Sequence, residues 1–250
     1  PPCVEPNLYN QLPFLTKVFE CVYVHNTSGD GYSLMNVDQK RLKKFNWAQS
    51  YNHVLDLYWD NSDRLNRVVI INANKKPKIK SRELYSERIK GILQLMKFDF
   101  IDLYGMNWNR ILSLTTFWPP FILNRSKVLQ NYKGKTDSKY ETLSQYDFCL
   151  CFENDVIESY ITEKIFDCFY CGTIPIYLGA PNIYNFVPKG TFIDARDFKD
   201  YSQMYSYLTN LSSVEKNNFK VKGREFLESK DMEIFYDGLI GIFSSEYDLR

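Results

Sequence analysis

The sequence has no long apolar run, little histidine and almost no net charge. No window approaches the eighteen or more apolar residues that a membrane-spanning helix needs, so none is predicted. The 31 Lys and Arg against 30 Asp and Glu leave a formal charge of +1. Nucleic acid or an anionic membrane surface is therefore disfavoured as the main partner, because either normally selects a basic excess. The 44% apolar and 24% charged residues are typical of a globular protein with a sizeable core.

A glycine-rich dinucleotide fingerprint is also missing. No G-x-G-x-x-G follows any predicted strand, which disfavours a redox enzyme that uses a nicotinamide or flavin dinucleotide. The sequence starts on Pro1 rather than on methionine and opens without a signal peptide. We therefore expect the natural start, and any targeting segment, to lie upstream.

Six cysteines are too few for a disulfide scaffold in 250 residues. Cys149 and Cys151, taken with Cys168 and Cys171, have a spacing that resembles a zinc site. We favour small core residues instead, because the first pair would share one face of a strand and the second one face of a helix. The sequence thus predicts no metal site.

From Leu65 onward, strand-like and helix-like segments alternate. Strand patterns occupy 67–74, 98–105, 146–154, 173–179 and 190–198, and helical patterns occupy 81–98, 138–145, 160–172 and 199–211 and continue toward the C-terminus. Ser81 is the expected N-cap of the first helix, and Gly172 is expected to close the third. This alternation predicts an α/β fold, a Rossmann-like parallel sheet with helices on both faces, over residues 65–250.

Residues 1–64 follow a different pattern. The segment 18–26 reads as a strand and 52–65 as a helix, but so few elements cannot close a domain. We interpret 1–64 as part of a second α/β domain whose beginning is absent.

Polar residues gather where the predicted strands end. In open parallel sheets, ligands bind at the carboxyl ends of the strands, and Glu153, Asn154 and Gly179 lie just past such ends. Gly179 is interpreted as a place of close chain approach rather than a ligand contact.

A Glu-Lys pair opens the helix that follows Asn154. A helix N-terminus near a strand end is an anion site, and Lys164 would add a full charge there, which favours a phosphate contact. Glu163 would repel phosphate and is better suited to accept hydrogen bonds from ribose or sugar hydroxyls. From the pair alone, an ordinary solvated helix surface is the favoured interpretation.

The segment 152–188, "FENDVIESYITEKIFDCFYCGTIPIYLGAPNIYNFVP", resembles the signature of the α-1,3/4-fucosyltransferases, glycosyltransferase family ten. That signature runs F-E-N, Y-[VI]-T-E-K, then an apolar helix and G-[TC]-[IV]-P-[IV]-x-x-G. The similarity continues through "FIDARDF", "NANKKP" and "DLYG", and it covers about residues 65–200. The resemblance implies a GT-B fold, in which two Rossmann-like domains face each other and the C-terminal one binds GDP-fucose.

Site residues follow from the same resemblance. Asn154, Tyr160, Glu163 and Lys164 match the donor-binding residues of the family, and Glu153 would contact the donor or cap the strand end. The family also neutralises the donor diphosphate with an arginine ahead of the D-x-x-G segment. Arg88 stands fourteen residues before Asp102 and fits that place, with Arg82 as the alternative. A guanidinium can hold two phosphate oxygens at once.

The implied chemistry is an inverting transfer of L-fucose from GDP-β-L-fucose to a glycan hydroxyl, giving an α-1,3 or α-1,4 fucoside. The family's base is an N-terminal glutamate that would lie upstream of Pro1, and Glu5 is the nearest candidate in this chain. No D-x-D triplet is present, so no metal or other cofactor is required beyond the donor substrate. A family relative with another nucleotide sugar, or a catalytically silent GDP-binding module, are the alternatives.

The implied partners are the nucleotide-sugar donor and a glycan acceptor: an oligosaccharide, a lipopolysaccharide or a glycoprotein. No nucleic acid is expected, whereas peripheral membrane association is compatible with such acceptors. The cytoplasmic face of a bacterial membrane and the Golgi lumen would both suit this chemistry.

Overall fold

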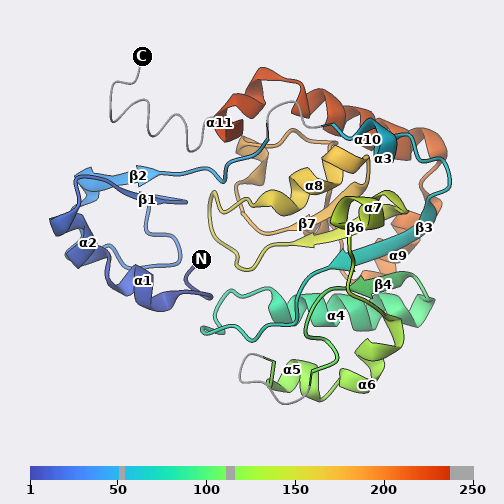
Figure 1. Cartoon of the computed structure of the whole chain (residues 1–250), viewed down its shortest axis with the longest axis horizontal. Helices are drawn as coiled ribbons and strands as arrows, with labels where there is room; N and C mark the ends of the chain where they lie inside the picture. Colours follow the sequence, from blue (N-terminus) through green and yellow to red (C-terminus); the bar gives the residue numbers. More distant parts are fainter. Residues whose placement is uncertain (51–53, 111–115, 237–250) are drawn as a thin grey trace.

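The computed structural model describes residues 1–50, 54–110 and 116–236, and its centre is a six-stranded parallel sheet (Figure 1). The strands are β3 (Leu65–Ile71), β4 (Ile101–Tyr104), β5 (Tyr132–Gly134), β6 (Tyr146–Phe152), β7 (Ile174–Leu178) and β8 (Ile193–Asp194). Their order is β5-β4-β3-β6-β7-β8, and every neighbouring pair is parallel. The predicted α/β sheet is confirmed; the three-residue β5 was not predicted.

Helices cover both faces of this sheet. One face carries α4 (Tyr85–Leu95), α5 (Pro119–Ile122), α6 (Arg125–Val128) and α9 (Tyr201–Asn210), and the other carries α7 (Lys139–Ser144), α8 (Glu163–Cys171), α10 (Ser213–Leu227) and α11 (Glu233–Tyr236). In Figure 1, α4, α5 and α6 lie below the sheet and α7, α8 and α10 lie above it. Short 3-10 turns occupy Gln39–Arg41, Met96–Phe98, Leu129–Asn131, Ile183–Asn185, Ala195–Asp197 and Lys230–Met232.

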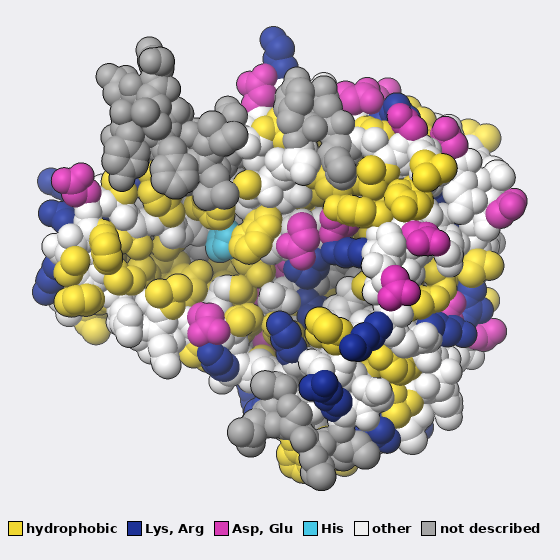
Figure 2. Space-filling view, viewed as in Figure 1, with side chains coloured by type: hydrophobic (Ala, Val, Ile, Leu, Met, Phe, Trp, Pro, Cys, Tyr) yellow, Lys and Arg dark blue, Asp and Glu magenta, His cyan; other side chains and the backbone are white. Residues whose placement is uncertain are grey.

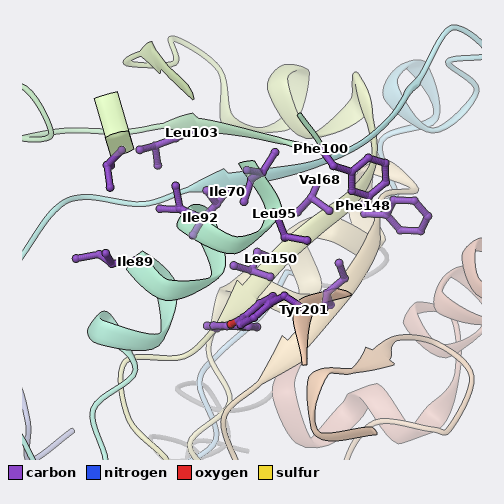
Figure 3. Close-up of a cluster of buried hydrophobic side chains, with 14 of the residues drawn as sticks. Val68, Ile70, Ile89, Ile92, Leu95, Phe100, Leu103, Phe148, Leu150 and Tyr201 are labelled. Atoms are coloured by element: carbon purple, nitrogen blue, oxygen red, sulfur yellow. The ribbon is translucent and has the colours of Figure 1, made fainter. Parts of the chain in front are cut away.

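Side chains of β3 and β6 alternate between two apolar layers. Val68 and Phe148 point toward α4, where Ile92 and Leu95 pack against them (Figure 3). Val69 joins the layer under α8. All seven residues of β6 are buried, as expected for a central parallel strand covered on both faces.

The N-terminal part forms a smaller unit. It contains α1 (Pro6–Asn10), α2 (Leu12–Val18), β1 (Val22–Val24) and β2 (Leu42–Lys44), and the two strands pair in parallel. The strand predicted within 18–26 is confirmed as β1. The helix predicted over 52–65 is limited to the single turn α3 (Asp56–Trp59), with 51–53 outside the described residues. The domain division at residue 64 stays a prediction.

The N-cap prediction at Ser81 is wrong. Helix α4 begins at Tyr85, because Arg82 adopts a left-handed backbone conformation with φ of 66° and interrupts the helical run. The segment before the helix pairs instead with the loop after β6: Glu83 forms an antiparallel bridge with Asp155, and Leu84 N–H donates to the Asn154 carbonyl at 3.1 Å. A tertiary contact thus determines where this helix starts.

Two predicted glycine roles are confirmed. Gly172 ends α8 in the left-handed conformation, with φ of 66°. At Gly179, an added Cβ would lie 2.5 Å from Cγ of Glu153, so only glycine fits between β7 and the end of β6. In the parts of the chain that the structure describes, no helix is long and apolar enough to cross a membrane.

Replacing Gly172 by alanine should lower the free energy of unfolding by about 1–2 kcal/mol, since a Cβ is disfavoured at this φ. The new Cβ would also lie 3.1 Å from the Trp59 ring. Urea unfolding of the variant and the wild type measures the difference. Equal midpoints and slopes would contradict the assigned backbone conformation.

Candidate functional site

The candidate site lies where β3 and β6 end, in the middle of the sheet. From β3 the following strands are added toward one edge of the sheet, and from β6 they are added toward the other edge. Helix α4, which follows β3, and helix α8, which follows β6, therefore lie on opposite faces. Such a reversal opens a crevice at the carboxyl edge of an α/β sheet. Figure 2 shows basic and acidic side chains lying together near the middle of one face of the molecule.

Glu153 is fully buried and ties α8 to the end of β6. Its Oε1 accepts from Thr162 N–H at 2.8 Å, and its Oε2 accepts from the Thr162 hydroxyl at 2.8 Å and from Lys164 Nζ at 3.0 Å. Glu153 was expected either to cap the end of the strand or to contact the donor. These hydrogen bonds give it a structural role at the strand end, and contact with the donor stays a prediction. Thr162 was not singled out from the sequence, although its position as N-cap of α8 was a usable signal.

Lys164 and Glu163 lie in the first turn of α8 and face solvent to different degrees. The Lys164 side chain is 22% exposed, and its Nζ also donates to the Thr162 hydroxyl at 2.7 Å. The Glu163 side chain is 43% exposed, with Oε1 3.7 Å from that ammonium. Partial burial raises the pKa of Glu163, but the charges of Lys164 and Lys139 outweigh it and hold this pKa below its usual value. An ionised Glu163 is thus available as an acceptor for hydroxyl groups.

Arg88 is buried beneath the loop that follows β6, with 4% of its surface exposed. Its Nη2 donates to the carbonyls of Phe152 and Glu153, each at 2.7 Å, and to Oδ1 of Asn154 at 2.9 Å. Burial lowers the pKa of the Arg88 guanidinium. The arginine therefore holds the loop from below, and its predicted contact with a diphosphate stays a prediction.

Asn154 and Tyr160 extend this network. Asn154 Nδ2 donates to the Tyr160 hydroxyl at 3.2 Å, and Tyr160 is only 3% exposed. The ring of His25, which follows β1, meets the Tyr160 ring edge to face at 4.9 Å between centroids. The N-terminal part thereby reaches the site. Sequence reasoning missed His25, because a single histidine after a strand carries no recognisable pattern.

Two predicted residues lie outside this network. Arg82 forms a bidentate pair with Asp30, at 2.6 and 2.9 Å, and Asp30 also accepts from Glu158 N–H at 2.8 Å. Arg82 thus joins the N-terminal part to the loop after β6. Glu5 forms a solvent-exposed ion pair with Lys78 at 2.8 Å.

His25 should make stability depend on pH. Burial lowers its pKa from 6.5 to about 4, and its Nδ1 has no hydrogen-bond partner among the described residues. Between these values the unfolded chain binds a proton that the folded chain does not, so stability falls as the pH drops from 6.5 toward 4. Between pH 7 and pH 5 the loss should be about 2 kcal/mol relative to His25→Phe, measured by urea unfolding. Identical pH profiles of the two proteins would contradict this assignment.

A protein-family model matches more than half of the chain. The model described as glycosyltransferase family 10 (fucosyltransferase), C-terminal part, matches residues 66–221. An alpha-(1,3)-fucosyltransferase of Helicobacter pylori is 45% identical over 75 residues, 30% of this chain and 16% of that protein. A GDP-fucose protein O-fucosyltransferase 3 of Xenopus tropicalis is 35% identical over 136 residues, 52% of this chain and 26% of that protein. The chain therefore spans about a quarter or less of the length of these relatives.

Solved structures support the fold. A crystal structure of TarM superposes with a TM-score of 0.59 at 11% identity, over 96% of this chain and 45% of that one. A glycosyltransferase from Rickettsia africae has the same TM-score at 10% identity, over 96% of this chain and 68% of that one. The sheet with helices on both faces is thus the α/β fold of GT-B glycosyltransferases. Because the family model matches more than half of its residues, the chain belongs to glycosyltransferase family 10, the fucosyltransferases.

Proposed function

We propose that this chain binds GDP-β-L-fucose at the crevice between β3 and β6 and forms the donor side of an inverting fucosyltransferase. One observation carries the proposal. Arg88 is distant in sequence from the 153–154 pair and the segment 160–164, yet hydrogen bonds of side chains and of the Glu153 carbonyl join them into one polar network at this edge of the sheet. This is the edge at which open α/β sheets bind their ligands.

Four residues at the crevice have distinct roles in the proposed donor complex. Lys164 and the N-terminus of α8 offer positive charge to the diphosphate, and Glu163 accepts hydrogen bonds from ribose or fucose hydroxyls. Arg88 and Asn154 fix the position of the loop after β6, which lies beside Lys164 and Glu163. Positive charge placed at the diphosphate stabilises the leaving GDP as negative charge develops on it.

The reaction is a single displacement at the anomeric carbon. An acceptor hydroxyl forms the new glycosidic bond while the bond to the β-phosphate oxygen breaks, and a carboxylate takes the hydroxyl proton. The product is an α-1,3 or α-1,4 fucoside. The proposed base is a glutamate upstream of Pro1, and Glu5 is the nearest alternative within this chain. No cofactor is part of this proposal.

The acceptor is proposed to be a glycan, free or carried by a lipid or a protein. Two observations favour this class: the match to the fucosyltransferase family, and relatives named for fucosylation of sugars and of proteins. Peripheral membrane association, at a bacterial cytoplasmic face or in the Golgi lumen, belongs to the same proposal.

Calorimetric titration of the chain with GDP-fucose, GDP-mannose, UDP-galactose and NADH tests the donor. Selective binding of GDP-fucose is the expected result. Equal binding of both GDP sugars would point to a guanine-nucleotide site with another donor, and binding of GDP-fucose without transfer after extension upstream would point to a silent module. No binding by a folded chain would contradict the proposal.

Glu163→Ala should weaken GDP-fucose binding by about 1–3 kcal/mol, or about 5–150-fold, through loss of charge-assisted hydrogen bonds to hydroxyls. The side chain is half-buried and its ion pair with Lys164 is long, at 3.7 Å, so the fold should be little affected. Glu141→Ala is the matched control, because it removes an exposed acid from the first turn of the neighbouring helix α7. Equal affinities for both variants would exclude Glu163 from the donor site.

A further inference from the structure

Three thiols meet in the apolar layer under α8. Cys149 and Cys151 project from β6 and Cys168 projects from α8, and all three are buried. Their Sγ atoms lie within 4.8 Å of one another, with 3.2 Å between those of Cys151 and Cys168. The spacing of these residues and of Cys171 in the sequence resembles a zinc site, but core residues were favoured and no metal site was predicted.

The convergence follows from local structure. Residues i and i+2 of a strand share one face, so Cys149 and Cys151 point the same way from β6. Helix α8 packs over that face and places Cys168 opposite them. Cys171, one turn further along α8, is buried as well but is not a member of the group of three.

The dimensions suit a metal ion of the zinc class. Bonds of about 2.3 Å in tetrahedral directions place the sulfur atoms around zinc about 3.8 Å apart. The 3.2 Å between Sγ of Cys151 and Cys168 is shorter than this value, and none of the three separations exceeds 4.8 Å, so small side-chain shifts would reach tetrahedral spacing. Beside the thiols is a cavity of about 20 Å³, whose polar lining residues are Asn72, Lys139, Cys149, Cys151 and Lys164 and whose other lining residues are apolar. That volume holds about one water molecule, which would supply a fourth ligand.

Lys139 and Lys164 line the small cavity beside Cys149 and Cys151, so two basic side chains lie near the thiols. Three thiolates and one divalent cation carry a net charge of −1, which is far cheaper to bury than three free thiolates. The Sγ atoms of Cys151 and Cys168 each lie 3.4 Å from the Lys164 carbonyl, so an ion here would lie directly behind the first turn of α8.

We propose that Cys149, Cys151 and Cys168 form a binding site for a divalent thiophilic cation, Zn²⁺ or a close relative. Soft thiolate ligands select such ions over Mg²⁺ and Ca²⁺. The site is structural: it would fasten α8 to β6 through three bonds, and it requires no change in the fold. It is separate from the proposed donor chemistry and does not depend on it.

The test is metal uptake by the reduced chain. Reduced protein is exposed to Zn²⁺, or to Cd²⁺ as a spectroscopic probe, desalted, and analysed for bound metal. We expect one ion per chain, a higher melting temperature, and a sulfur-to-cadmium absorption band of the intensity given by three thiolates. Mg²⁺ should give none of these. The Cys168→Ala variant should lose uptake at least tenfold, whereas the control Cys171→Ala should keep it.

Two results would overturn the proposal. One is a folded, reduced chain that retains no zinc or cadmium, whether or not oxidation then joins Cys151 to Cys168. The other is equal uptake by the Cys168→Ala and Cys171→Ala variants. Far-ultraviolet circular dichroism shows whether Cys168→Ala folds. If it does not, the absorption intensity per bound cadmium in the wild type tests the proposal instead. An intensity that corresponds to one or two thiolates would contradict the three-thiol site.

Discussion

Lys164→Ala is expected to lower the free energy of unfolding by about 3 kcal/mol, the cost of breaking a buried ion pair from one side. The loss of stability comes from Glu153, the ion-pair partner of Lys164. Glu153 is fully buried, and the variant would leave its carboxylate without the ammonium that binds it at 3.0 Å. The same variant should weaken GDP binding by about 1–3 kcal/mol, because it also removes a charge offered to the diphosphate. Urea unfolding and calorimetry measure the two effects.

A second substitution separates these effects. Glu153→Gln in the Lys164→Ala background replaces the unpaired carboxylate by a neutral amide of similar shape, so most of the lost stability should return. GDP affinity should stay low, because the lysine is still absent. Recovery of both properties would mean that Lys164 acts only through the fold. Recovery of neither would contradict the pairing of Lys164 with Glu153.

Arg88→Ala is expected to destabilise the protein by at least about 3 kcal/mol, since it leaves buried acceptors without their donor. The Nη2 group of Arg88 donates hydrogen bonds to the carbonyls of Phe152 and Glu153 and to the side-chain oxygen of Asn154. Without it the loop that frames the proposed donor site loses its support from below. GDP binding should weaken by about 1–3 kcal/mol.

Lys90→Ala is the matched control for Arg88→Ala. Lys90 is an exposed cation on the same helix α4, in an ion pair with Glu87 that should be worth less than about 1 kcal/mol. Stability and GDP affinity of the control should stay near wild type. If Arg88→Ala lost GDP affinity with its stability unchanged, direct contact with the diphosphate would be the better explanation than support of the loop.

The burial of the polar network has a consequence for its role. Glu153 and Arg88 use their hydrogen bonds within the protein, whereas the side chains of Glu163 and Lys164 stay partly accessible. Preorganised groups of this kind stabilise charge without having to rearrange when a ligand arrives. We therefore expect the inner residues to set stability and the outer two to set donor selectivity.

The sequence by itself determined the arrangement of the domain. Short apolar runs predicted five of the six sheet strands, because a strand covered on both faces is apolar along most of its length. A period of 3.6 residues predicted four of the helices, because a helix packed on a sheet buries one stripe of its side chains. Gly172 and Gly179 were predictable for the same local reason, since a backbone turn or a close approach excludes any side chain.

Only the tertiary structure decided the start of α4, the burial of Arg88, the contact of His25 with Tyr160 and the meeting of the three thiols. Each depends on a partner that is distant in sequence: the loop after β6 meets residues 82–84, and α8 covers β6. A charged residue such as Arg88 has the same local pattern whether it faces water or three buried acceptors. Its environment is fixed by how the loop after β6 packs over α4, and no local period encodes that packing.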